Sequence, residues 1–387
     1  MSKFLLLISF ISIVFFNSCS ESVYKVSANR NNFYVMRING SQYTEKIKIF
    51  KVGETANLII YAESGYSINY NYVSYVAKKF EDNYSKMINI YGNHTDVDKN
   101  GKIIILFQKI NANINGNSIV MGYFLPNDLI YGDFNNAEIL YMDINLLNKN
   151  PLLIAGTVLH EFQHLINFNV NYIQKRKDMS LWLNESLSES TSILFDSYMT
   201  RNRIDEFNNI NYYCFYTWEL PYPYNLMFVN YPSASVFMNW LYQKNNRNES
   251  VFRNIAHSSE SEDYKKVLGA AGYGNDWQGL LINWIDGIKK GQVNGAKINN
   301  WNSTWTTTAY LYPGALVYGN SKIHVNPSTD LSGNPQAIRA QIYEDNFIIT
   351  SRSADNTANE NNIYLQTTQK PKYIDLVFDK DGKIKKY

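Results

Sequence analysis

The segment PLLIAGTVLHEFQHLINF, residues 151–168, decides the interpretation of this chain. Asn150 in front of it is a good helix N-cap, and Pro151 suits the first helical turn. Apolar side chains recur along the whole segment, and Gly156 is its only glycine. We therefore predict a helix that is buried in a core and carries the sequence HEFQH at residues 160–164.

The two histidines of HEFQH are four residues apart. On a helix this spacing puts His160 and His164 on the same face, so both imidazoles can point at one ion. Glu161 leaves the helix at a different angle and can reach a water molecule without binding the ion. In a helical context this pattern predicts a zinc site with Glu161 as general base.

A catalytic zinc site has three protein ligands and one open position, so a third ligand is needed. The segment WLNESLSE, residues 182–189, lies in a second predicted helix that runs from Ser180 to about Met199. Glu185 and Glu189 share a face of that helix. We expect Glu185 to bind zinc and Glu189 to accept the free N–H of a ligand histidine. The alternative is a solvated face, which the apolar neighbours of these glutamates disfavour.

HEFQH together with NESLSE resembles the thermolysin-like gluzincins, a group of zinc peptidases. HTDVDKNGKIIILF (94–107) and MGYFLPNDL (121–129) are similar to the hyicolysin family of bacterial metallopeptidases. The resemblance covers roughly residues 55–290. It implies one zinc ion and these roles: ligands His160, His164 and Glu185, general base Glu161, and support of the histidines by Asn184 and Glu189.

Three classes of function remain open at this point. The absence of the G-x-M-E-N motif of aminopeptidases favours an endopeptidase acting on a peptide or protein substrate. WLNE resembles the WLNEG of membrane-alanyl aminopeptidases, so an exopeptidase is the first alternative. A surface binding lipoprotein on a peptidase scaffold is the second, although a pure binder has no use for Glu161 beside three ligands.

The resemblance to aminopeptidases extends to NYPSASVFMNWLY, residues 230–242, which is similar to their Y-x-x-G-A-S-V segment. In those enzymes the tyrosine stabilises the tetrahedral oxyanion, which implies that role for Tyr231. An ordinary buried tyrosine is the alternative interpretation. His257 is a second candidate for the role, because some gluzincins use histidine there.

The N-terminus, MSKFLLLISFISIVFFNSCS, has one lysine followed by an apolar run from Phe4 to Phe16. This is typical of a secretory signal, and the run is short for a membrane span. Cys19 stands where a bacterial lipoprotein carries its acylated cysteine. We therefore expect an exported protein of the cell envelope, anchored to a membrane through a lipid on Cys19, or else secreted. Cys214 then has no partner for a disulfide.

The composition fits a globular protein: of 387 residues, 45% are hydrophobic and 18% are charged. The net charge of +2 gives no reason to expect a nucleic-acid partner. Periodicity predicts strands at FYVMRI, EKIKIFKV, ANLIIYAE, KIIILF and AEILYMD, and a helix at residues 69–91. MGYF is interpreted as an edge strand that pairs with extended substrate, or simply as a structural strand.

The predicted fold class is α+β. A gluzincin-type catalytic domain, with a mixed sheet, active-site helices and a helical lobe, precedes an all-β, sandwich-like domain. The predicted boundaries are a signal peptide at 1–19, an N-terminal β region at 20–65, the zinc metallopeptidase domain at 66–295 and the β domain at 298–387.

The segment DVDKNG imitates the first half of a calcium loop through Asp96, Asp98, Asn100 and Gly101. A calcium loop needs a glutamate at its twelfth position, and Phe107 stands there. The sequence therefore favours an Asx turn over a calcium site at this point.

Overall fold

The computed structural model describes the chain in separate stretches and forms two compact units, Met1–Met199 and Thr200–Tyr387. Side chains are described within residues 30–37, 43–111, 120–130, 134–175, 177–209, 213, 215–216, 230–277 and 279–298. For residues 38–39, 41–42, 227–229 and 278 and for short strands beyond residue 298, only the backbone is described. The predicted signal peptide, Cys19 and Cys214 lie outside the described residues. The units divide the chain within the predicted 66–295 domain, and the domain boundaries stay predictions.

The first unit contains a six-stranded mixed sheet with the strand order β1-β2-β3-β4-β6-β5. The strands β3, β4 and β6 are parallel to one another, whereas β1, β2 and β5 join antiparallel to their neighbours. Their bounds are β1 (Asn32–Asn39), β2 (Ser41–Glu54), β3 (Leu58–Glu63), β4 (Ile103–Gln108), β5 (Gly122–Phe124) and β6 (Ile139–Asp143). The predicted strands are thus confirmed, and β5, the predicted MGYF strand, is an edge strand of this sheet.

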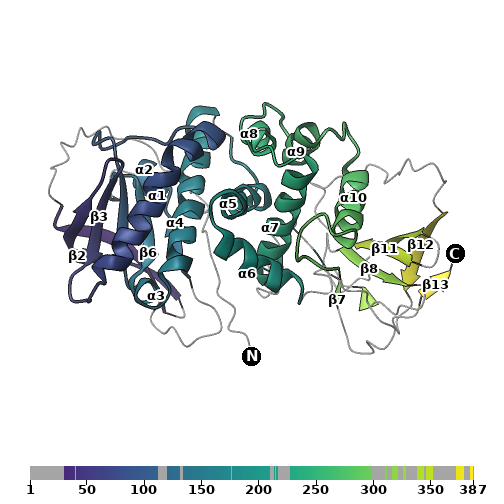
Figure 1. Cartoon of the computed structure of the whole chain (residues 1–387), viewed down its shortest axis with the longest axis horizontal. Coiled ribbons are helices and arrows are strands. Elements are labelled where there is room, and N and C mark those ends of the chain that lie inside the picture. Colours follow the sequence, from purple (N-terminus) through teal and green to yellow (C-terminus); the bar gives the residue numbers. More distant parts are fainter. Residues whose placement is uncertain are drawn as a thin grey trace. The chain divides into compact units, whose positions relative to one another are not determined.

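Helices α1 and α4 pack side by side, and α4 also contacts β5, β6 and α5 (Figure 1). The helix predicted at 69–91 is α1, and the side chain of Asn69 caps it by accepting from the backbone N–H groups of Asn71 and Tyr72. The helical bounds are α1 (Tyr70–Tyr91), α2 (Asn127–Ile130), α3 (Ile144–Lys149), α4 (Pro151–Asn167), the π-helical segment η1 (Phe168–Ile173), α5 (Leu181–Phe195) and α6 (Ser197–Phe207).

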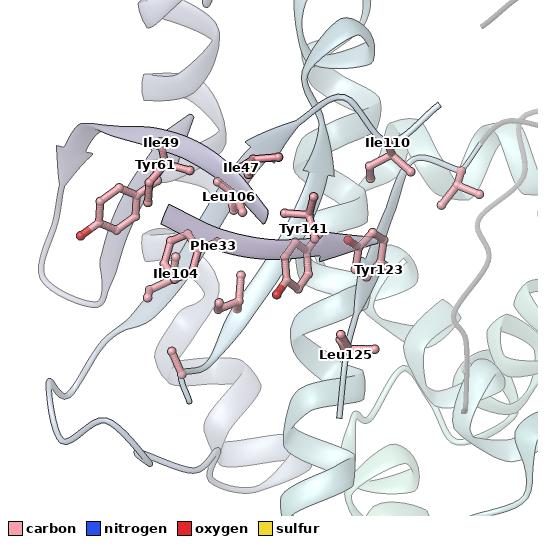
Figure 2. Packing of buried hydrophobic residues seen from close by; sticks show 14 residues of the cluster. Phe33, Ile47, Ile49, Tyr61, Ile104, Leu106, Ile110, Tyr123, Leu125 and Tyr141 are labelled. Atoms are coloured by element: carbon pink, nitrogen blue, oxygen red, sulfur yellow. The ribbon is translucent and has the colours of Figure 1, made fainter. Parts of the chain in front are cut away.

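An apolar cluster covers the sheet face on which β1 lies (Figure 2). Side chains alternate between the two faces of a strand, so Ile104 and Leu106 of β4 contribute to this cluster while their neighbours point to the other face. Two hydroxyls fix β1 across the cluster: Tyr123 accepts from the Met36 backbone N–H at 2.8 Å, and Tyr141 donates to the Tyr34 carbonyl. Helix α4 thus packs on β5 and β6 of a sheet whose other face carries this cluster.

The second unit begins with helices that match the predicted helical lobe: α7 (Met227–Lys244), α8 (Ser250–Ala256), α9 (Asp263–Ala271) and α10 (Trp277–Lys289). Beyond residue 298 the described backbone forms a five-stranded antiparallel sheet of order β13-β12-β10-β11-β8 and a two-stranded parallel pair. The strands are β7 (Tyr310–Leu311), β8 (Leu316–Asn320), β9 (Asn326–Pro327), β10 (Ile338–Tyr343), β11 (Asn346–Ser351), β12 (Lys372–Phe378) and β13 (Ile384–Lys386). The sandwich itself stays a prediction.

None of the helices in the described part of the chain has the length and apolar character that crossing a bilayer requires.

Candidate metal centre

The HEFQH segment lies in α4, which is buried along nearly its whole length. Its beginning follows the prediction: the Asn150 side chain accepts from the Leu153 N–H at 3.2 Å, and Pro151 occupies the first turn. Gly156 lies one turn before His160, and its lack of a side chain lets Asp196 and Met199, which follow α5, approach α4 closely. A Cβ built on Gly156 would lie 2.4 Å from Cγ of Met199, too close for any larger side chain without movement.

Two imidazoles and one carboxylate meet in the interior between α4 and α5. Nε2 of His160 lies 3.1 Å from Nε2 of His164, and Oε2 of Glu185 lies 3.3 Å and 3.4 Å from these two atoms. Tetrahedral ligands at the usual zinc distance of about 2.0–2.1 Å are about 3.3 Å from one another. The three atoms are therefore spaced as three vertices of a zinc tetrahedron.

The ring of His164 is held from behind by two residues of α5. Nδ1 of His164 lies 3.0 Å from Oδ1 of Asn184 and 3.1 Å from the Ser188 hydroxyl. The amide oxygen of Asn184 can only accept, so it favours the tautomer that carries the hydrogen on Nδ1 and leaves Nε2 free for a metal. Asn167 donates to the same oxygen at 2.7 Å and orients it.

The sequence prediction named Asn184 but missed Ser188 and Asn167. Ser188 is the serine of the N-E-x-x-S-E pattern and, because it is four residues after Asn184, it faces the same way. That spacing could have found Ser188. Asn167 is three residues after His164, and no pattern in the sequence distinguishes it from the many other asparagines.

Glu189 lies next to the other histidine, as expected, but at a longer distance than a hydrogen bond. Its Oε1 is 3.7 Å from Nδ1 of His160, and both side chains are buried. The position is consistent with a carboxylate that supports His160 electrostatically, and the hydrogen bond itself stays a prediction.

Glu161 is fully buried, and neither of its carboxylate oxygens accepts a hydrogen bond of normal geometry. Burial raises its pKa to about 8, with Glu185 adding to the effect, while His164 and the nearby Phe124 backbone of β5 lower it. Such a carboxyl group is poised to exchange a proton near neutral pH. Phe124 belongs to the edge strand β5, so this strand lies next to Glu161.

The electrostatics of the three converging side chains fit a bound cation. Burial lowers the pKa of His164, but Glu185, with smaller contributions from Glu161 and Asn184, raises the pKa to about 9. Burial opposes ionisation of Glu185 as well, yet the two histidines lower its pKa below the usual value. This cluster thus favours positive charge on an imidazole, and Oε1 of Glu185 is buried without a hydrogen bond. Two nitrogens and one oxygen form a donor set that suits zinc.

The two candidates for oxyanion stabilisation lie in the second unit. Tyr231 is in α7 and 1% exposed, with the guanidinium carbon of Arg203 5.1 Å from its ring centroid. His257 follows the last residue of α8 and is exposed. Their assignments stay predictions, because the structure describes each unit by itself.

We predict that Asn184→Ala weakens zinc binding about 10–100-fold, because His164 loses the acceptor that fixes its tautomer. The measurement is competition with a chromophoric zinc chelator. Asn83→Ala on α1, where the amide only donates to the Lys79 carbonyl, serves as the matched control and should bind zinc normally. Equal zinc affinity in wild type and Asn184→Ala would contradict this role.

No protein-family model matches the chain. The chain is similar to the neutral metalloprotease ShpI of Staphylococcus hyicus, with 27% identity over 189 residues. The matched region covers 44% of this chain and 42% of that protein, so the chain spans less than half the length of this relative. The distant similarity supports a metallopeptidase family for this chain, and it leaves the branch of that family open.

Proposed function

We propose that this chain is a zinc-dependent endopeptidase of the hyicolysin-like gluzincins, exported from a bacterial cell, with His160, His164 and Glu185 as zinc ligands. The observation that supports this most strongly is the 3.1–3.4 Å triangle of two Nε2 atoms and one carboxylate oxygen. The similarity to a neutral metalloprotease is independent support.

Zinc bound at this triangle would supply a Lewis acid and lower the pKa of water to about 7. The proton chemistry belongs to Glu161. Its buried carboxylate takes the proton of the attacking water and then gives it to the departing amine. An extended peptide that paired with the edge strand β5 would pass next to Phe124 and therefore next to Glu161.

We predict that Glu161→Gln retains one zinc per chain and lowers kcat/KM at least about 10²–10⁴-fold, because glutamine cannot take the proton. The substrate is an internally quenched peptide blocked at both ends, and metal content is measured on the same samples. Glu260→Gln, an exposed glutamate of the second unit, is the matched control and should cleave like wild type.

Three results would count against this proposal. Wild-type turnover by Glu161→Gln would remove the general base from the mechanism. Cleavage by wild type only of peptides with a free N-terminus would favour the aminopeptidase alternative, and cleavage of neither peptide by the zinc-loaded chain would favour a binding protein.

We assign the stabilisation of the tetrahedral oxyanion to Tyr231, and predict that Tyr231→Phe lowers kcat about 10²–10³-fold with little change in KM. The phenylalanine keeps the buried ring and removes only the hydroxyl. Tyr242→Phe on the same helix is the control, since its half-buried ring stacks on Phe252 and should be neutral. An unchanged kcat in Tyr231→Phe would transfer the role elsewhere, with His257 as the next residue to test.

We further propose that a lipid on Cys19 anchors the exported protein to a membrane of the cell envelope. Cells that express the full chain with a radioactive fatty acid should label the wild-type protein and recover it with membranes. Cys19→Ala should be unlabelled, and Cys214→Ala, as the control, should be labelled like wild type. An unlabelled wild-type protein would indicate a secreted product without an anchor.

A further inference from the structure

Three acidic side chains outside the candidate metal centre come together at a second place in the first unit. Asp96, Asp98 and Glu138 each offer one carboxylate oxygen, and these oxygens all lie within 4.8 Å of one another. Asp96 and Asp98 belong to the loop that leads into β4, whereas Glu138 directly precedes β6. The parallel pairing of β4 with β6 joins the two, and the Ile104 N–H donates to the Glu138 carbonyl at 2.7 Å.

The loop has the internal hydrogen bonds of a preformed turn. Oδ1 of Asp96 accepts from the Gly101 N–H at 3.1 Å, and Oδ1 of Asp98 accepts from the Asn100 N–H at 3.3 Å. Gly101 adopts φ 70°, which glycine reaches without strain. These bonds fix the direction of the two aspartates and leave the loop with no need to fold around a ligand.

Glu138 is the observation that points to a ligand. Its side chain is fully buried, and Oε1 accepts from the Val97 N–H at 2.8 Å. Oε2 is buried and accepts no hydrogen bond of normal geometry. Burial raises the pKa of this carboxyl, and the nearby Thr95 hydroxyl and the Val97 N–H lower it only in part. A buried carboxylate oxygen without a well-aligned donor is costly, and a cation or a proton removes that cost.

The charges around the three carboxylates match a divalent cation. Nη2 of Arg30 lies 3.4 Å from Oδ2 of Asp98. Three negative charges and this one positive charge leave a net charge of −2 when the carboxyls are ionised. Burial and the neighbouring Glu138 raise the pKa of Asp98 to about 6. The ionised carboxylates therefore repel one another, and a cation between them would remove this repulsion.

We propose that Asp96, Asp98 and Glu138 bind one calcium ion, with Glu138 replacing the glutamate that a calcium loop carries at its twelfth position. The donors are all oxygens, as calcium prefers, and their irregular arrangement suits calcium better than the strict octahedron of magnesium. Asp96 is exposed, so water can complete the coordination on that side. A bound ion would tie the start of β4 to the start of β6 and stabilise the first unit.

The test uses the zinc-loaded full chain carrying Glu161→Gln, so that self-cleavage does not enter the measurement. Calcium should bind with a stoichiometry of one and a Kd of about 10⁻⁵–10⁻³ M by calorimetry, and should raise Tm by about 3 °C or more at saturation. Adding Glu138→Gln should weaken calcium binding at least 10-fold and abolish the rise in Tm. Asp82→Asn, an exposed aspartate on α1, is the control and should leave both unchanged.

Asp96→Asn provides a second variant, because its exposed side chain can lose charge without disturbing the core if Glu138→Gln fails to fold. No calcium binding by the folded parent chain, or full calcium binding in Asp96→Asn and Glu138→Gln, would overturn the proposal. An equal affinity for magnesium would overturn the assignment of the site to calcium. None of these outcomes depends on peptidase activity.

Discussion

The contact between α4 and α5 is the constraint on which the candidate centre depends. Three ligand atoms can lie 3.1–3.4 Å apart only if two helices from different parts of the sequence pack closely and in one register. Gly156 contributes to this closeness although glycine costs about 1 kcal/mol in a helix interior relative to alanine. A side chain there would collide with Met199 and push apart segments that must converge one turn later.

Burial makes the charged side chains of this centre energetically costly, and it also shifts their pKa values. His160, His164, Glu161 and Glu185 are all at most 3% exposed, in surroundings where an unpaired charge is strongly disfavoured. The same surroundings strengthen each electrostatic interaction, so the two histidines can lower the pKa of Glu185 while burial raises the pKa of Glu161. One cation changes this group of costly side chains into a satisfied one, which is why metal binding and stability are expected to be coupled here.

Helical spacing made most of this centre predictable, because residues four apart on one helix must share a face. His160 with His164, and Asn184 with Ser188, are such pairs. Of the second pair, the sequence analysis named Asn184 but not Ser188. Features that depend on packing were harder to predict. The helix expected to continue to about Met199 ends at Phe195, and Asp196 stands between it and α6. Glu138 was invisible to local patterns, since only the pairing of β4 with β6 brings it to the DVDKNG loop.

The parallel pair β4–β6 carries acidic residues at both ends, and the comparison explains why only one of them needs an ion. At the carboxyl end, Asp143 is fully buried, but Oδ2 accepts from the N–H groups of Ile110 and Asn111 and Oδ1 caps α3. Backbone donors therefore satisfy both of its oxygens. At the amino end, Glu138 has one backbone donor, and its second oxygen accepts no hydrogen bond of normal geometry. Because α4 follows this strand pair after only α3, an ion at the amino end would stabilise the same two strands that precede the helix with the two proposed histidine ligands.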